Sequence, residues 1–133
     1  YLDIEIVESS LFDNIDAVID VMNQLRKLGI SFSLDDFGTG FSNLAYLKVL
    51  PISYLKIDKS FIDNIIKNKH ASAMCSCIIS LANRLYIETV AEGVESEFQV
   101  IALRAMRCNF IQGYYYSKPL GVAELETKYY TSV

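Results

Sequence analysis

The sequence predicts an α/β fold in which short parallel strands alternate with helices, and two observations predict it. Five apolar runs recur along the chain with starts 22 to 34 residues apart, and apolar residues at helical spacing lie between them. Polar residues with chemically reactive groups follow each run at its carboxyl end. Such repeats are typical of a parallel sheet covered by helices. Periodicity alone leaves two architectures open: an open flavodoxin-like sheet, and a little over half of a closed barrel.

The elements follow in order along the chain. The first predicted helix has Ile15, Val18 and Met22 on one face and ends before Gly29, because glycine is typical of helix C-termini. The second predicted helix is short and ends before Pro51, whose ring does not fit a helix interior. The predicted strands are Leu2–Val7, Ile30–Leu34, Ile52–Ile57, Tyr86–Ala91 and Asn109–Gln112, the predicted helices are Asp13–Leu28, Ser42–Leu47, Ala71–Leu85 and Ser96–Met106, and residues 126–133 are predicted to form a C-terminal tail.

Length and composition exclude several classes of protein. The 133 residues suit one domain but are too few for a complete eight-unit barrel of about 250 residues, and the chain opens without Met inside an apolar run, so we expect a piece of a longer protein. Twelve basic and sixteen acidic residues give a net charge of −4, which argues against DNA or RNA as a partner. The longest stretch without Asp, Glu, Lys or Arg, residues 70–83, is shorter than the roughly 20 residues that span a bilayer.

The three cysteines indicate a compartment. Cys75, Cys77 and Cys108 are odd in number and lack the spacing of a metal site, so we expect them to be reduced. Reduced cysteines are typical of the cytoplasm. We therefore expect a cytoplasmic domain that makes no membrane contact itself, although preceding segments of a longer protein could tether it to a membrane.

Acidic residues at the ends of the predicted strands indicate a site. In parallel α/β folds, sites form at the carboxyl ends of the strands. Alone, each acidic residue has an ordinary explanation as a helix N-cap or a surface ion pair, so the prediction depends on the whole set. In strand order, the polar residues are Glu5 and Glu8, Asp35 and Asp36, Lys56 and Asp58, Glu92 and Glu95, and Gln112.

Converging carboxylates indicate bound metal. Several ionised carboxylates in one cleft repel one another unless a positive charge balances them. Mg²⁺ or Mn²⁺ suits oxygen ligands best. Asp35 and Asp36 would point to opposite faces of a regular strand, but both could reach the rim if the pleat breaks there. One could then bridge two metal ions, an arrangement that holds a phosphoryl group and generates hydroxide.

A glycine-containing loop, Phe37–Phe41, follows the aspartate pair. Its Gly38-Thr39-Gly40 segment invites a dinucleotide-binding interpretation, but the third glycine of that fingerprint is absent. Two carboxylates directly before the loop would also repel a pyrophosphate. A loop that joins the predicted metal site to a surface explains this segment better.

At these residues the sequence resembles the EAL domain family, bacterial phosphodiesterases that hydrolyse cyclic di-GMP. The resemblance extends to about Leu125 and depends on several strings that occur in the family's order and spacing. They are Ile4-Glu5-Ile6-Val7-Glu8-Ser9, Asp35-Asp36-Phe37-Gly38-Thr39-Gly40-Phe41-Ser42, Leu50-Pro51, Leu55-Lys56-Ile57-Asp58, Ser60-Phe61, Ala91-Glu92-Gly93-Val94-Glu95, Gln112-Gly113-Tyr114 and Ser117-Lys118-Pro119.

The resemblance implies a modified TIM barrel of which this chain, residues 1–133, would be the C-terminal portion, about five strands. It implies two divalent metal ions, Mg²⁺ or Mn²⁺, held by or near Glu5, Asp35, Asp36 and Glu92. Lys56 would position the attacking water or a phosphate oxygen. The product would be linear pGpG.

The resemblance also assigns supporting residues. Asp58 and Gln112 would form the floor and wall of the site, with Gln112 among the catalytic residues beside Lys56 and Glu92, and Glu95 would support it. Glu8 would hold the loop of Phe37, Gly38, Thr39, Gly40 and Phe41, which couples the site to a dimer interface. A homodimer and a preceding sensory or GGDEF domain are the implied partners.

Two departures from the family pattern limit these expectations. The Glu-Ala-Leu signature and an Asn ligand belong to strands that precede this segment, and Ala123-Glu124-Leu125 lies beyond the last strand. Val7 stands where Thr is common. We therefore expect the isolated fragment to be inactive. A catalytically silent module that binds the nucleotide or a partner protein is one alternative, and a flavodoxin-like signalling domain without metal chemistry is another.

Overall fold

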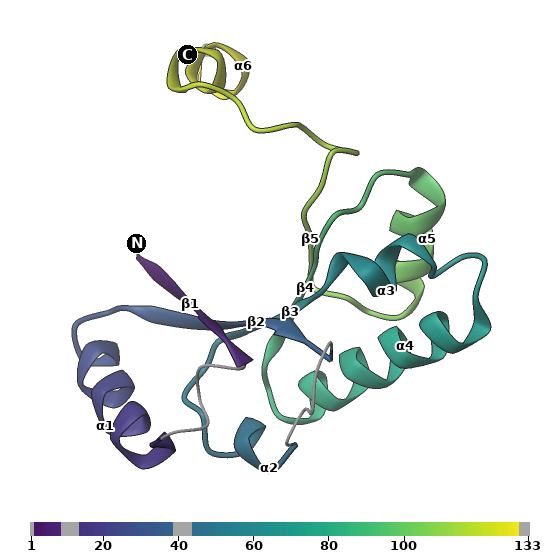
Figure 1. The fold of residues 1–133 in the computed structure, drawn as a ribbon. Coiled ribbons are helices and arrows are strands. Elements are labelled where there is room, and N and C mark those ends of the chain that lie inside the picture. Colours follow the sequence, from purple (N-terminus) through teal and green to yellow (C-terminus); the bar gives the residue numbers. More distant parts are fainter. Residues whose placement is uncertain (1, 9–13, 39–43, 131–133) are drawn as a thin grey trace.

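The computed structural model describes residues 2–8, 14–38 and 44–130, so Thr39, Gly40 and Phe41 of the predicted loop lie outside the described residues. Five parallel strands form one sheet in the order β1-β2-β3-β4-β5 (Figure 1). The strands are β1 Asp3–Val7, β2 Ser31–Phe37, β3 Tyr54–Ile57, β4 Glu88–Ala91 and β5 Phe110–Ile111. Each strand pairs with the next strand along the chain, whereas a flavodoxin-like sheet reverses its order. The sequential order confirms the barrel-type architecture.

Six helices are found in the described part of the chain. The four predicted helices are present with ends shifted by a few residues. The short α3 was not predicted, and neither was α6, which includes the first part of the predicted tail. The helices are α1 Ile15–Arg26, α2 Leu44–Leu47, α3 Lys59–Asp63, α4 Lys69–Arg84, α5 Glu97–Ala105 and α6 Val122–Tyr129. None of the described helices has the length and apolar character needed to cross a bilayer.

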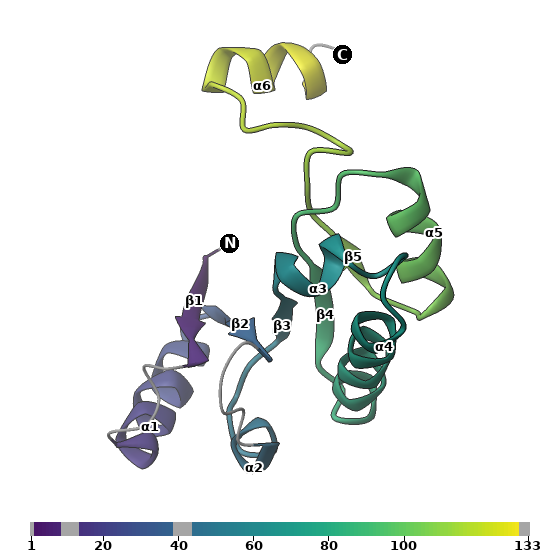
Figure 2. The same cartoon turned by 45° about the vertical axis from the view of Figure 1, so that its right-hand side comes forward.

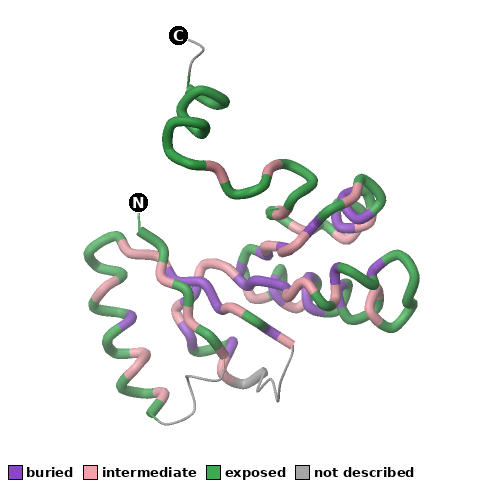
Figure 3. Tube along the Cα trace, turned by 45° about the horizontal axis from the view of Figure 1, so that its top comes forward, coloured by how far each residue is buried: buried purple, intermediate pink, exposed green. Residues whose placement is uncertain are grey.

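One face of the sheet packs against helices and forms the core. Alternate strand residues such as Leu34, Leu55 and Ile57 are almost completely buried there, together with Ile79 of α4. Figures 1 and 2 show α1, α2 and α4 on the same side of the strands. Figure 3 shows the buried residues in the middle of the molecule, while α6 is exposed almost throughout its length. The core thus fixes the strands from one side only.

The opposite face of the sheet, which we call the polar face, carries the charged side chains of the strands among a few apolar ones. Side chains alternate between the faces of a strand, so Glu5 lies between the core-facing Ile4 and Ile6, and Lys56 between Leu55 and Ile57. The parallel register then brings neighbouring strands together with their polar residues on one side. This face supports the candidate site.

Three helices end in the same way before a strand begins. A residue in the left-handed conformation ends each helix: Gly29 at φ 84°, Tyr86 at φ 59° and Arg107 at φ 64°. After α4, the N–H of Tyr86 bonds to the carbonyl of Asn83 and that of Ile87 to the carbonyl of Ala82. This pair of bonds is the Schellman motif. It turns the chain sharply, so that the next strand starts within two or three residues.

Candidate active site

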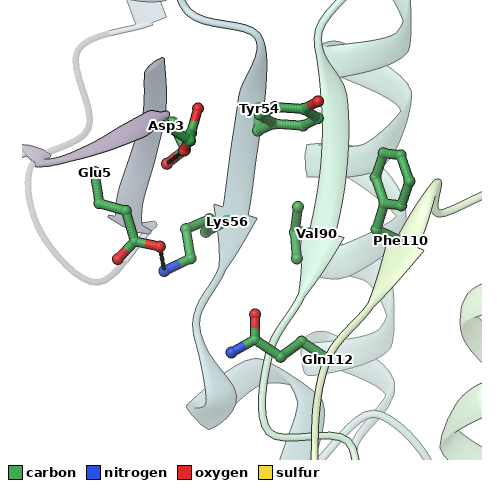
Figure 4. A pocket seen from close by; sticks show the side chains of 8 residues that line it. Asp3, Glu5, Tyr54, Lys56, Val90, Phe110 and Gln112 are labelled. Carbon is green, nitrogen blue, oxygen red and sulfur yellow. Dashed lines mark hydrogen bonds and ion pairs between the residues drawn. The ribbon is translucent and has the colours of Figure 1, made fainter. Parts of the chain in front are cut away.

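Lys56 lies at the centre of the polar face and contacts three carboxylates from three other parts of the sheet. Its Nζ lies 2.8 Å from Glu5 Oε1, 3.3 Å from Asp35 Oδ2 and 2.8 Å from Glu92 Oε1. Figure 4 shows the contact with Glu5. Lys56 is only 7% exposed. Residues from β1, β2, β3 and the end of β4 therefore meet at one ammonium group.

The charges in this cluster do not balance. Burial alone would lower the pKa of Lys56, but hydrogen bonds to Glu5 and Glu92 and the charges of Glu92 and Asp35 outweigh it, so the pKa is raised above its usual 10.5. Lys56 therefore stays protonated at neutral pH. One positive and three negative groups leave a formal charge of 1 − 3 = −2. A further cation is thus favoured at this point.

The aspartate pair lies at a break in strand β2. The pairing with β3 shifts register between Leu34 and Phe37, and Asp36 has φ 56°, in the left-handed region. Its N–H donates to Asp35 Oδ1 at 2.9 Å. Bulges of this kind redirect side chains, and non-glycine residues in this conformation concentrate at functional sites. The strand therefore loses its regular pleat at the two aspartates.

A cavity of about 280 Å³ opens beside Lys56 on the polar face. Gln112, which follows β5, lines this cavity with Glu5 and Lys56 (Figure 4), and its role as the wall of the site stays a prediction. The other lining residues are Asp3, Ser33, Tyr54, Val90 and Phe110. The sequence analysis did not identify these five lining residues. Each of them stands two positions before a predicted site residue and therefore lies on the same face of the sheet.

The remaining predicted residues lie around the cluster. Asp58 is the N-cap of α3, and its Oδ1 accepts from the N–H of Ser60 at 3.0 Å. Hydrogen bonds from Ser60 and Lys59 lower the pKa of Asp58 against the opposing effect of burial. Glu95 pairs with Lys59, a residue that was not predicted. Glu8 is half-buried directly after β1, and Phe37 is buried at the end of β2.

The donor set suits a divalent cation in its chemistry. Glu5, Asp35 and Glu92 offer the hard oxygen ligands that Mg²⁺ and Mn²⁺ prefer, and the charge of the cluster has the right sign. Within the described residues, however, no three His, Cys, Asp or Glu side chains form a ready ligand group, because the three carboxylates face the Lys56 ammonium. The metal ligands therefore remain a prediction.

A singly wound parallel α/β sheet with a charged cluster at the carboxyl ends of its strands is the arrangement of a barrel enzyme's active site. The chain belongs to the EAL domain family, whose pattern matches residues 1–119. This confirms the family that the sequence strings resemble.

Relatives and solved structures agree with this membership. The chain is 45% identical over 126 residues to the cyclic di-GMP phosphodiesterase NbdA of Pseudomonas aeruginosa, covering 95% of this chain and 16% of that protein. It superposes on the EAL enzyme Bd1971, solved with cAMP and cyclic di-GMP, at a TM-score of 0.89 and 42% identity, covering 95% of this chain and 33% of that one. It also superposes on Klebsiella pneumoniae BlrP1, solved as a complex with manganese and cyclic di-GMP, at a TM-score of 0.80 and 28% identity. That match covers 88% of this chain and 30% of the BlrP1 chain. The chain thus spans a minor part of these proteins.

Proposed function

We propose that this chain supplies the central charged cluster of a phosphodiesterase that hydrolyses cyclic di-GMP to linear pGpG. The observation that supports this most directly is the meeting of Glu5, Asp35 and Glu92 at one buried lysine. NbdA is named a phosphodiesterase of this nucleotide, and Bd1971 and BlrP1 were solved with it bound. We extend that substrate to the full protein of which this segment is a part.

The proposed reaction adds the oxygen of water to one phosphorus atom and breaks the bond from that phosphorus to the 3′ oxygen, which takes up a proton from the solvent and becomes the 3′ hydroxyl of pGpG. Lys56 would hold a negatively charged phosphate oxygen or orient the attacking water, because its ammonium stays charged and nearly dehydrated. The Glu92 carboxylate would accept the proton of that water, and the Gln112 amide would hydrogen-bond the substrate in the adjoining cavity.

We propose that Glu5, Asp35, Asp36 and Glu92 hold two divalent ions in the complete site. Bound there, Mg²⁺ or Mn²⁺ would supply Lewis-acid stabilisation and lower the pKa of water. The bulge at Asp35 and Asp36 supports this, since a break in the pleat lets adjacent carboxylates reach the same rim of the sheet. BlrP1 supports manganese as one candidate.

A second function also has a specific observation in its favour. Lys56 already neutralises part of the carboxylate cluster, and the described residues hold no ready ligand group. A silent EAL-type module would bind cyclic di-GMP in the same cavity without cleaving it.

One experiment separates these functions. The full-length protein is incubated with cyclic di-GMP and Mn²⁺ or Mg²⁺, and pGpG is measured by chromatography while nucleotide binding is measured by calorimetry. We expect metal-dependent turnover that Lys56→Ala largely removes and that Lys67→Ala, the same change at an exposed lysine, leaves intact. Binding without product in the wild-type protein would instead support the silent module.

A further inference from the structure

The connection between β4 and α5, residues 92–96, bears directly on the site because it begins with Glu92. The N–H of Glu92 still bonds to the carbonyl of Ile57 in β3, at 3.1 Å. Beyond that point the chain leaves the sheet. The position of the Glu92 carboxylate therefore depends on the conformation of the residues that follow it.

Lys59, at the start of α3, reaches across to this connection. Its Nζ donates to Glu95 Oε1 at 2.7 Å and lies 3.5 Å from the carbonyl oxygen of Gly93. It also donates to Asp63 Oδ1 at 2.9 Å, within its own helix. The hydrogen bond to Glu95 raises the pKa of Lys59 most, and the bond to Asp63 raises it further. One ammonium thus joins α3 to both the start and the end of the connection.

The stem of Lys59 also lies against the backbone. Gly93 has φ 66°, and a Cβ placed there would collide with Cγ and Cδ of Lys59. Only glycine allows both this backbone conformation and this contact. The methylene groups of Lys59 therefore cover the residue directly after Glu92.

Other hydrogen bonds hold the same connection. Gln99 of α5, which is buried, accepts from the N–H groups of Glu95 and Ser96, both at 2.9 Å, and donates to the carbonyl of Ile62 in α3 at 3.0 Å. The N–H of Val94 bonds to the carbonyl of Gln112 at 3.1 Å. Because Gln112 lines the cavity beside Lys56, the connection links two of the proposed catalytic residues.

We propose that Lys59 is a positioning residue: it holds residues 92–96 in the conformation that presents Glu92 to Lys56 and keeps Gln112 in place. Among the described residues, Lys59 does not line the cavity, and its hydrogen bonds and ion pairs go to Asp63, Gly93 and Glu95. Its effect on catalysis rests on the proposed function, but its hold on the connection does not.

The size of the effect follows from exposure. The side chains of Lys59 and Glu95 are 45% and 53% exposed, so their ion pair adds little to the stability of the whole protein. A pair of this kind shifts a local equilibrium about two- to fivefold. A shift of this size changes the free energy of global unfolding very little. It is measurable in the catalytic rate if that rate depends on the position of Glu92.

Lys59→Met tests the proposal in the full-length protein, since methionine keeps most of the apolar stem and removes the charge. We expect amide hydrogen exchange of Val94 and Glu95 to rise about two- to fivefold, and kcat to fall by a similar factor with KM unchanged. Lys59→Arg should restore both, and the melting temperature should stay within about a degree or two.

Asp63→Asn is the matched control, because it removes the partner inside α3 and leaves the bond to Glu95. It should change neither exchange nor kcat. Unchanged exchange in Lys59→Met would overturn the proposal, as would faster exchange with wild-type kcat. If the wild-type protein shows no hydrolysis, the proposed function fails, and faster exchange in Lys59→Met alone still supports the hold on the connection.

Discussion

Asp36 combines an unusual backbone with a predicted role at the metal site. Its φ of 56° lies in a region that disfavours most side chains, whereas Asn and Asp tolerate it best. Replacement by asparagine therefore keeps both the shape and the backbone and removes only the charge. The substitution therefore tests the charge of Asp36 separately from its shape and its backbone conformation.

We expect Asp36→Asn in the full-length protein to retain less than about a tenth of the wild-type hydrolysis of cyclic di-GMP, because a neutral amide binds a divalent ion poorly. The measurement is a steady-state assay at saturating Mn²⁺. Asp20→Asn, the same change on the exposed face of α1, should behave like the wild type. Retention of more than a tenth of the activity would argue against Asp36 as a ligand.

At this scale the sequence predicts which side chains meet at the strand ends, but not how helices and loops contact one another. Glu5, Asp35, Lys56 and Glu92 meet as their places at strand ends indicate, since parallel strands align their carboxyl ends. Lys59 was missed because its contacts depend on how α3 and the β4–α5 connection lie in space. No local pattern in the sequence reports that arrangement.

Among the elements, α3 depends on its N-cap residue, Asp58. Asp58 caps the helix, and its lowered folded pKa means that it stabilises the fold above its usual value of 3.8 and loses this contribution as the pH falls below that value.

We expect Asp58→Ala to lower the free energy of unfolding by about 1 kcal/mol at pH 7. The difference from the wild type should shrink at pH 3, below the usual value of 3.8, because the unfolded chain then takes up a proton that the folded carboxyl binds less readily. Urea unfolding at the two pH values measures this. An equal loss at both would show that the charge of Asp58 does not contribute.

Helix α4 ends in a conformation that its sequence does not favour. Tyr86 occupies the left-handed position of the Schellman motif, where glycine is usual, and its side chain is 95% exposed. Tyr86→Gly removes the steric cost and loses almost no packing.

We expect this substitution to raise the free energy of unfolding by about 0.5–1 kcal/mol, since the cost of a left-handed tyrosine exceeds the added entropy of glycine in the unfolded chain. Tyr86→Ala, which keeps the Cβ, should give little gain. Thermal unfolding compares the two, and equal stabilities would show that the backbone at Tyr86 is unstrained.

The prediction of elements from sequence succeeds where the pattern is long. Gly29 marks the end of α1 in the sequence as in the structure, but Tyr86 and Arg107 adopt the same conformation without a glycine to reveal it. The five-residue α3 is too short for a helical period, and α6 has no buried residue, so neither produced an apolar pattern strong enough to recognise.

For the whole molecule, the sheet has two edges in the part of the chain that the structure describes, β1 and β5. A strand edge presents unpaired backbone groups that invite another chain. Exposed apolar side chains such as Leu2 and Phe110 lie on these edge strands or next to them.

We expect the isolated 133-residue chain to self-associate, most simply as a two-fold dimer that covers its edges. Light scattering at several concentrations measures the mass. A monomer at every concentration would contradict this expectation.

The sequential strand order also has a consequence for the order of folding during synthesis. Each strand pairs with the strand made just before it, so β1 to β3 can associate while the rest of the chain is still on the ribosome. Glu5 and Lys56 can then meet early, but Glu92 reaches Lys56 only after α4 has formed and β4 has docked. Lys56 can therefore meet its first two carboxylates early, whereas Glu92 arrives last and brings the cluster to its full excess of negative charge.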